Sequence, residues 1–290
     1  MEANSNKNIV LVIGNGFDLD LGFKTSYKDF WESEFCPKLY PAPLIGHMNT
    51  KWENSLEAVK WYDLENELLH YYDINSSRSK WHDIFSDEEM AFFRKFNSYN
   101  YACRQYDDKR DLIEKLVRTG YAITGNPYLF SLEIPYLEDY KLSTRDRDYK
   151  ALKLIKQGLC KYLKAASAQQ TEKSSVARSV IYALSEAAGL GDNLVIYNFN
   201  YTELPYPYCD SETLFYIHGR CKDDNIIVGT KDYSGFSKDY DFLQKSFDPD
   251  FQTPPVVYDL LHADEVVFFG HSLGVNDSQY FKPFFTQQTH

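Results

Sequence analysis

Residues 8–22 read NIVLVIGNGFDLDLG, and this stretch decides the fold. After Asn8 the run to Ile13 is wholly apolar and rich in β-branched side chains, and Gly14 and Gly16 follow at once. A short apolar run without alternation predicts a strand buried on both faces, as in a parallel sheet covered by helices. The glycines permit a sharp turn from this strand into a helix. The start of the chain therefore predicts the first strand–helix unit of an α/β fold.

Further apolar runs along the chain extend this pattern. They lie at Asn193–Asn198, Leu214–Ile217, Asn225–Val228 and Glu265–Phe269, and a helix is expected over Pro255–His262. Strands that alternate with helices are typical of α/β proteins. We expect a Rossmann-like, mostly parallel sheet with a large helical insertion after the first strand–helix unit.

Helix signals dominate the middle of the chain. They comprise an N-cap at Thr25 or Ser26, apolar residues at helical spacing over 56–69, a capping box at 86–89, and helices over 151–166 and 174–188. We therefore assign 1–50 and 190–290 to a Rossmann-like nucleotide-binding core. Residues 51–189 are assigned to a helical insertion subdomain.

The amino-acid composition limits the classes of partner that the protein is expected to bind. The formal net charge is -11 with no run of Lys or Arg, which disfavours binding to nucleic acid. The five cysteines are scattered, odd in number and never in a C-x-x-C pair, as expected for reduced thiols rather than disulfides or a zinc site. The first apolar run is too short for a signal peptide or a membrane span. We expect a cytoplasmic protein that contacts neither nucleic acid nor membrane.

Aromatic residues are abundant, with 24 Tyr and 20 Phe. Tyrosine combines an apolar ring with a polar tip, which suits half-buried surfaces and subunit contacts. The aromatic helical segments YYDIN (71–75) and FNSYNYACRQY (96–106) could form a homo-oligomer contact, and they could equally belong to the core.

Four turns follow the predicted strands, at Gly14–Gly22, Phe199–Glu203, His218–Gly219 and Gly270–Asp277. Ligands of parallel α/β sheets bind beyond the carboxyl ends of the strands, so these turns should converge on one crevice. The first turn begins G-x-G but lacks the third glycine of the dinucleotide fingerprint.

The polar residues of these turns have both functional and structural interpretations. Asn15 and Asp18 could bind a ribose or order a water, or they could cap a helix. Asn200 could hold a ribose hydroxyl or form an Asx turn. His218 could be a general base or a structural histidine. The histidine spacing predicts no metal site.

Two carboxylates, Asp63 and Glu65, lie on the first helix of the insertion. Residues two apart point to different faces of a helix, so these two cannot form a dyad within it. We expect one of them to face the crevice.

The sequence GHSLG at 270–274 matches the G-x-S-x-G pattern of a serine-hydrolase nucleophile elbow. In such enzymes the acid and the histidine follow the serine along the chain. Only sixteen residues follow Gly274, too few for the strands and loops that carry a triad. Ser272 and Asp277 are therefore expected in a ligand-binding turn.

Taken in order, several of these segments resemble the AbiH family of bacterial phage abortive-infection proteins. The resemblance runs through VIGNGFDLDLGFKTSYKDF, WYDLENEL, IYNFNYTE, YIHG, IIVGTKD and FFGHSLGVNDSQYF. The usual last strand of the family has no counterpart after YFKPFFTQQTH, so a short or truncated member is expected.

AbiH proteins in turn resemble the sirtuin-type NAD-binding fold, and this implies a nucleotide site. In that comparison Asn200 would hold the nicotinamide ribose, and His218 would act as a base or orient the ribose. The residues implied to bind the nucleotide are Gly14, Asn15, Gly16, Asp18, Gly22, Thr25, Tyr201, Gly219, Gly270, Ser272 and Asp277. The C-x-x-C zinc module of sirtuin deacylases is absent, and Thr202 replaces an aspartate of their motif, which disfavours a protein deacylase.

The resemblance leaves hydrolysis of the nicotinamide–ribose bond of NAD as the expected activity, without a metal. Asn200, His218 and Glu65 are the expected catalytic residues, with Asp18 as an alternative to Glu65. A non-catalytic sensor of a nucleotide signal, or an interaction module of a defence system, is the alternative. A nuclease or phosphotransferase using Asp18, Glu203 and Asp277 ranks last, because their spacing matches no known motif.

Overall fold

A computed structural model describes most of the chain. The described residues are 7–55, 63–76, 88, 107–109, 111–112, 144–168, 175–189, 193–204, 213–232 and 240–287.

A four-stranded, all-parallel sheet forms one part of the molecule. Its strands are β1 (Ile9–Ile13), β2 (Leu194–Asn198), β3 (Leu214–Tyr216) and β4 (Glu265–Phe269), in the order β3-β2-β1-β4. The carboxyl ends are level, because Ile13 pairs with both Asn198 and Phe269. The residues of β1 are at most 3% exposed, in agreement with a strand covered on both faces.

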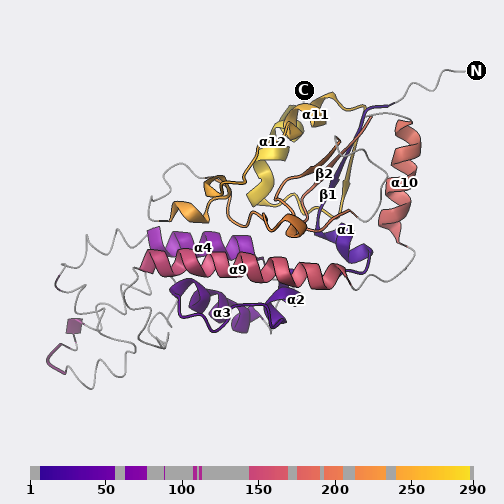
Figure 1. Cartoon of the computed structure of the whole chain (residues 1–290). Helices are drawn as coiled ribbons and strands as arrows, with labels where there is room; N and C mark the ends of the chain where they lie inside the picture. Colours follow the sequence, from indigo (N-terminus) through magenta and orange to yellow (C-terminus); the bar gives the residue numbers. More distant parts are fainter. Residues whose placement is uncertain are drawn as a thin grey trace, which may run out of the picture.

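Helices cover both faces of this sheet (Figure 1). Helices α1 (Asn15–Asp20) and α10 (Val176–Ala188) pack on one face, where Phe17 and Ile181 meet the odd-numbered residues of β1. On the other face, α11 (Val256–His262) and α12 (Ser278–Gln287) pack against the even-numbered residues. Because side chains alternate between the two faces of β1, its residues contribute to two separate apolar clusters, one on each face of the sheet.

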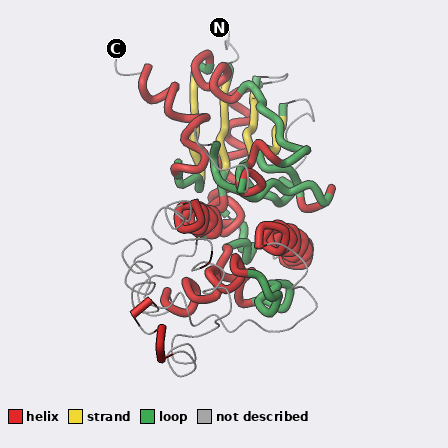
Figure 2. Tube along the Cα trace, turned by 90° about the vertical axis from the view of Figure 1, so that its left-hand side faces the viewer, coloured by secondary structure: helices red, strands yellow, loops and turns green. Residues whose placement is uncertain are grey.

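A second layer of helices lies beyond the carboxyl ends of the strands (Figures 1 and 2). It contains α2 (Tyr27–Glu32), α3 (Pro43–Ser55), α4 (Leu64–Ser76) and α9 (Thr144–Ser167). Trp31, Met48, Leu68 and Ile155 belong to its own apolar core. Short 3-10 helices complete the described elements: η1 (Asp107–Lys109), η3 (Cys221–Asp223), η4 (Asp241–Leu243), η5 (Lys245–Phe247) and η6 (Val275–Asp277).

The α/β class and four of the five predicted strands are confirmed. The strand predicted at Asn225–Val228 is wrong. This segment bonds to the turn after β3 through Ile227 N to His218 O at 2.8 Å, while Ile226 and Val228 enter the helical core. Burial alone explains its apolar pattern, and pattern cannot separate a buried loop from a buried strand.

The helices predicted at 151–166, 174–188 and 255–262 are confirmed as α9, α10 and α11, with ends shifted by a few residues. Ser26 is the N-cap of α2, where its hydroxyl accepts a hydrogen bond from Asp29 N. The capping box at 86–89 lies outside the described residues, Glu88 excepted.

The proposed domain boundaries stay a prediction. Helix α10 packs on the sheet although the boundaries place it in the insertion, and the boundary after residue 50 cuts through α3, which packs on α9. Of the aromatic segments, Tyr71 and Tyr72 lie in the helical core, and 96–106 lies outside the described residues. In the described part of the chain, no helix has the length and apolar character to cross a membrane.

Candidate functional site

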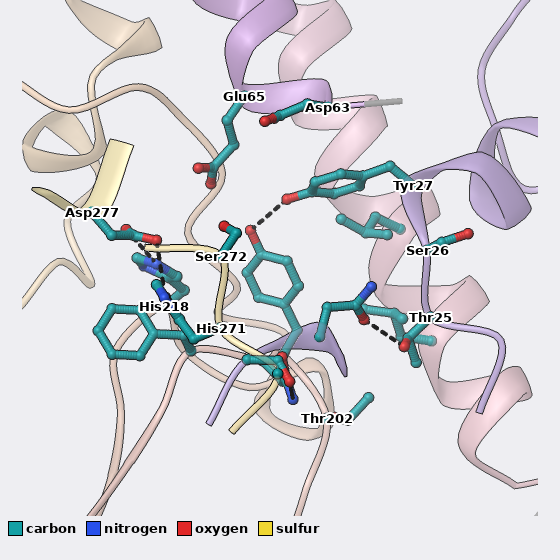
Figure 3. Close-up of a pocket in the computed structure, with 18 of the residues that line it drawn as sticks. Thr25, Ser26, Tyr27, Asp63, Glu65, Thr202, His218, His271, Ser272 and Asp277 are labelled. Atoms are coloured by element: carbon teal, nitrogen blue, oxygen red, sulfur yellow. Dashed lines mark hydrogen bonds and ion pairs between the residues drawn. The ribbon is translucent and has the colours of Figure 1, made fainter. Parts of the chain in front are cut away.

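The four turns do converge, at a cavity of about 170 Å³ between the sheet and the helical layer (Figure 3). Helices α2, α4 and α9 supply the wall that faces the turns. The lining residues are Gly14, Asn15, Thr25, Ser26, Tyr27, Lys28, Asp63, Glu65, Leu159, Leu163, Phe199, Asn200, Tyr201, Thr202, His218, Gly270, His271, Ser272 and Asp277. Both Asp63 and Glu65 are included, although we expected only one of them there.

Glycines bring the β1 and β4 turns into direct contact. A Cβ on Gly14 or Gly16 would lie 2.7 Å from a backbone atom of His271 or Gly270, and Gly16 N donates to Gly270 O at 2.9 Å. Gly270 has φ +66, and a Cβ there would lie 2.3 Å from Phe17 N. These glycines are therefore required for close packing. Because Gly16 N is already bonded and α1 has only six residues, α1 offers little as a phosphate site.

Asp18 and Asn200 form a buried network behind the cavity wall. Asn200 Nδ2 donates to Gly14 O and to Asp18 Oδ1, each at 3.0 Å, while Thr202 Oγ1 donates to Asp18 Oδ2 at 2.5 Å. Burial raises the pKa of Asp18 to about 7, although these hydrogen bonds lower it in part. Asp18 does not line the cavity and caps no helix. It connects the β1 turn to the end of β2.

The other residues predicted to bind a nucleotide are divided between the cavity and its surroundings. Asn15 lines the cavity and accepts a 2.6 Å hydrogen bond from Thr25 Oγ1. Gly16, Gly22 and Gly219 do not line it. Gly219 borders a separate, more open hollow beside β3.

A buried lysine connects the acidic residues of the site. Lys245 is 1% exposed, and its Nζ lies 3.1 Å from Glu65 Oε2, 2.9 Å from Asp277 Oδ1 and 3.3 Å from His218 Nε2. Burial lowers the pKa of Lys245, but the charges of Glu65 and Asp277 outweigh this effect and raise it. The ammonium thus remains charged and holds together the carboxylates of α4 and η6.

Lys245 lowers the pKa of both Glu65 and Asp277, yet the net shifts of the two groups are opposite. Burial raises the pKa of Glu65 to about 7, against the partial compensation of Lys245 and with the help of the Asp277 charge. Burial alone would also raise the pKa of Asp277, but His218 and Lys245 hold it well below its usual range. At neutral pH Asp277 is therefore ionised, while Glu65 can take up or release a proton.

His218 is neutral at pH 7. Burial and the neighbouring Lys245 ammonium lower its pKa. Its Nε2 lies 3.0 Å from Asp277 Oδ1, and a carboxylate can only accept, so Nε2 carries the proton and donates a hydrogen bond to Asp277. The 3.3 Å approach of the Lys245 ammonium to the same nitrogen is then a contact between two donors and not a hydrogen bond. His218 Nδ1 then carries the lone pair, and it has no hydrogen-bond partner in the described part of the chain. This is a histidine held in one tautomer by an aspartate, as a general base requires.

Two tyrosines stand between the histidine and the helical wall. Tyr27 OH and Tyr201 OH lie 3.3 Å apart, and Tyr201 OH also lies 3.3 Å from Ile227 O. A carbonyl can only accept, so Tyr201 donates to Ile227 and Tyr27 donates to Tyr201. Burial raises the pKa of both phenols, and the Glu65 charge adds to this shift.

Ser272 lies at the cavity, and among the described residues no histidine is hydrogen-bonded to its hydroxyl. The side chain of the adjacent His271 instead accepts from Leu273 N through Nδ1 and lies 3.6 Å from Asp277 Oδ2 through Nε2. This geometry agrees with the topological argument against a serine nucleophile. Within the described ranges, no group of three or more His, Cys, Asp and Glu could hold a metal ion.

Sequence reasoning missed Lys245 and His271. Lys245 lies in a polar segment, KDYDFLQKSF, that carries no motif, so its burial depends on contacts with residues distant in sequence. His271 stands inside G-x-S-x-G, a pattern that singles out the serine. A signal for His271 was its place directly after a strand, as for His218.

The fold and the site together define an α/β protein with a crevice beyond the carboxyl ends of a parallel sheet and a buried cluster of acidic and basic side chains beside it. A model of the family described as bacteriophage abortive infection AbiH matches residues 10–290. The chain belongs to the AbiH family, and this membership supports a role in abortive-infection defence against phage. No curated protein and no solved structure matches the chain, so the likeness to sirtuin-type NAD-binding proteins stays a prediction.

Proposed function

We propose that this AbiH protein binds NAD or a related nucleotide in the cavity and hydrolyses its nicotinamide–ribose bond. The observation that carries the proposal is the pair of proton-exchanging groups, Glu65 and His218, lining one cavity beyond the sheet. The pKa of Glu65 is about 7 and His218 is neutral, so both can act near physiological pH.

The chemistry matches these groups. When the C–N bond breaks, its electron pair moves to the pyridinium nitrogen, and nicotinamide leaves as a neutral molecule. Water adds its oxygen to the ribose carbon and gives a proton to a base. His218 is the proposed base, because Asp277 fixes its tautomer. Glu65 as a carboxylate stabilises the positive charge that develops on the ribose.

Asn200 is proposed to orient the ribose. Both hydrogen bonds from its Nδ2 go to the protein, so Oδ1 is the atom left to accept from a ribose hydroxyl. Asp18, the alternative to Glu65, is oriented away from the cavity into the Asn200 network. It acts on the site by holding Asn200.

The size of the cavity supports binding of one end of a dinucleotide inside it. Pockets that enclose a whole drug-sized ligand measure about 300–1,000 Å³. At about 170 Å³, this cavity suits the nicotinamide riboside half. The rest of the nucleotide would extend past Asn15, Lys28 and Ser272.

The test is nicotinamide release from NAD by the purified protein, followed by chromatography. Glu65→Gln keeps the shape of the side chain and removes its charge, and we expect a loss of about 100-fold or more in rate. Glu67→Gln is the matched control, because Glu67 lies on the same helix but bonds to His47 at 3.2 Å outside the cavity. Equal rates for both variants would exclude Glu65 from the chemistry.

Asn200→Ala is a weaker test than Glu65→Gln. It deletes the donor to Gly14 O and to the buried Asp18, so loss of activity could reflect loss of folding. The unfolding transition of each variant must therefore be measured beside its activity.

A nucleotide sensor is the second candidate, and one observation favours it. The Lys245 ion pairs join Glu65 of the helical layer to Asp277 of the sheet layer across the cavity, so a ligand there contacts both layers. Binding of NAD at one molecule per chain without nicotinamide release would support this function over hydrolysis.

A further inference from the structure

The hydrogen-bond donors that line the cavity are mostly used within the protein. Thr25 Oγ1 donates to Asn15, Ser26 Oγ donates to Asp29, and Thr202 Oγ1 donates to Asp18. The Asn200 amide and the two tyrosine hydroxyls are also committed, as described above. Among the described lining residues, the side-chain donors left for a ligand are Asn15 Nδ2, the Ser272 hydroxyl and the Lys28 ammonium.

Acceptors and negative charge remain available. Asp63, Glu65 and Asp277 line the cavity, and Figure 3 shows the Asp277 carboxylate directed at His218 and His271. The side-chain oxygens of Tyr27, Tyr201 and Asn200, which also line the cavity, add lone pairs that can accept hydrogen bonds. A ligand that satisfies this wall must itself carry donors or a positive charge.

The positive charge of the site is mostly unavailable to a ligand. Lys245 is enclosed at 1% exposure and already paired with Glu65 and Asp277. Within the described residues, Lys28 is the only Lys or Arg that lines the cavity, and it is partly exposed at the side of α2. A phosphate group inside the cavity would face Asp63, Glu65 and Asp277. The single Lys245 ammonium is paired with the last two and leaves this wall with a net negative charge, which disfavours a second anion.

Aromatic residues complete the environment. Tyr27, Tyr201 and Phe199 line the cavity between the carboxylates and the turns. Aromatic faces attract cations and stack on heteroaromatic rings. The walls thus combine negative charge, acceptors and aromatic surface in one small space.

We propose that the cavity selects a positively charged heteroaromatic ring with hydrogen-bond donors, such as a pyridinium carboxamide, and leaves phosphate groups outside. This inference rests on the proposed function for the identity of the ring, because nicotinamide is a cation only while it is bonded to ribose in oxidised NAD. Cleavage converts the ring to a neutral product that the acidic wall holds less tightly. Selection for charge would therefore favour both the substrate and the release of its product.

The test compares two probes that differ in charge and not in ring or amide. These are 1-methylnicotinamide, a cation, and nicotinamide, which is neutral, and their affinities are measured by calorimetry at low salt and about pH 7.5. We expect the cation to bind roughly tenfold more tightly, or better, to the full chain. In Glu65→Gln and in Asp63→Asn this ratio should fall several-fold, while Glu67→Gln should retain it.

Asp63→Asn is a second, independent test of the acidic wall, in case the Glu65 variant does not fold. Asp63 accepts from Asn66 N and Asn66 Nδ2 at the start of α4, and asparagine is an equally good N-cap. Equal affinity for the two probes overturns the inference, as does a cation preference that survives in both variants.

Failure of this inference can be told apart from failure of the proposed function. Neither probe has a ribose bond to cleave, and the nicotinamide-release assay does not compare charges. If the protein releases nicotinamide from NAD but does not prefer the cationic probe, the proposed hydrolysis stands and the selection for charge is refuted. If the protein prefers the cationic probe but releases no nicotinamide, the selection for charge stands and the proposed hydrolysis is refuted.

Discussion

Asp18 offers a direct test of the buried network, through the variant Asp18→Asn. The carboxyl group is 4% exposed and accepts from Asn200 Nδ2 and Thr202 Oγ1, and within the described structure it forms no ion pair. Asparagine is isosteric with it: the amide oxygen can accept from Asn200, and the amide nitrogen can donate to the Thr202 hydroxyl. The variant therefore reproduces the neutral form of Asp18.

The magnitude follows from the pKa. Burial moves the pKa of Asp18 from 3.8 to about 7 in the folded protein. Between these values the folded state holds a proton that the unfolded state has released, so stability falls as pH rises through this window. The full effect is on the order of 4 kcal/mol, from about three pKa units at 1.36 kcal/mol each. About 3 kcal/mol of it falls between pH 5 and pH 8.

The assay is urea unfolding followed by tryptophan fluorescence at about pH 5 and about pH 8. The asparagine side chain cannot ionise, so the variant does not lose this stability as pH rises. Relative to the wild type, its free energy of unfolding should therefore be about 3 kcal/mol higher at pH 8 than at pH 5. Glu186→Gln, on the exposed side of α10, controls for loss of an ordinary carboxylate and should show no such gain. A difference between Asp18→Asn and wild type that is the same at both pH values refutes the assignment.

Three further predictions concern the cluster and the turns. Lys245→Met leaves two carboxylates in the cluster without their cation, so we expect a loss of about 3–5 kcal/mol in urea unfolding at pH 8 and a smaller loss at pH 5, where protonation relieves the charge. Gly270→Ala should cost about 2–5 kcal/mol, because its φ is +66 and the Cβ would meet α1, whereas Gly274→Ala at φ -62 should be close to neutral by the same measurement. Affinity for 1-methylnicotinamide should rise from about pH 6 to about pH 8 as Glu65 ionises, measured by calorimetry, and a flat profile would contradict this role. The titratable groups that face Glu65 are Lys245, Asp277, Asp63, Tyr27 and Tyr201.

The parallel sheet was predictable because its signal is local. Each strand is a short apolar run that ends in glycine or polar residues, and NIVLVIGNG shows this most clearly. The convergence of the four turns followed from topology, since parallel strands end at one edge. The segment at 225–228 shows the limit, because its apolar residues are buried without joining the sheet.

The roles of the site residues were less predictable. Asn200 and Asp18 were expected as separate ligand contacts, and the structure pairs them with each other across 182 positions of sequence. The glycines of the first turn were expected to bind the nucleotide, and the structure uses Gly14 and Gly16 to pack against the turn at 270–271. In each case the side chain or turn meets a partner that is remote along the chain.

The sequence by itself determined the strands, the turns that follow them and the acid–base residues available at their ends, because these depend on local apolar runs, glycines and order along the chain. Only the tertiary structure decided how these groups are charged. Lys245 reaches Glu65, Asp277 and His218 from a segment without any motif, and its ammonium, together with burial, sets which of them is ionised. The pKa of each group depends on its distance to other charges and on its burial, and both are properties of the folded chain rather than of the order of residues.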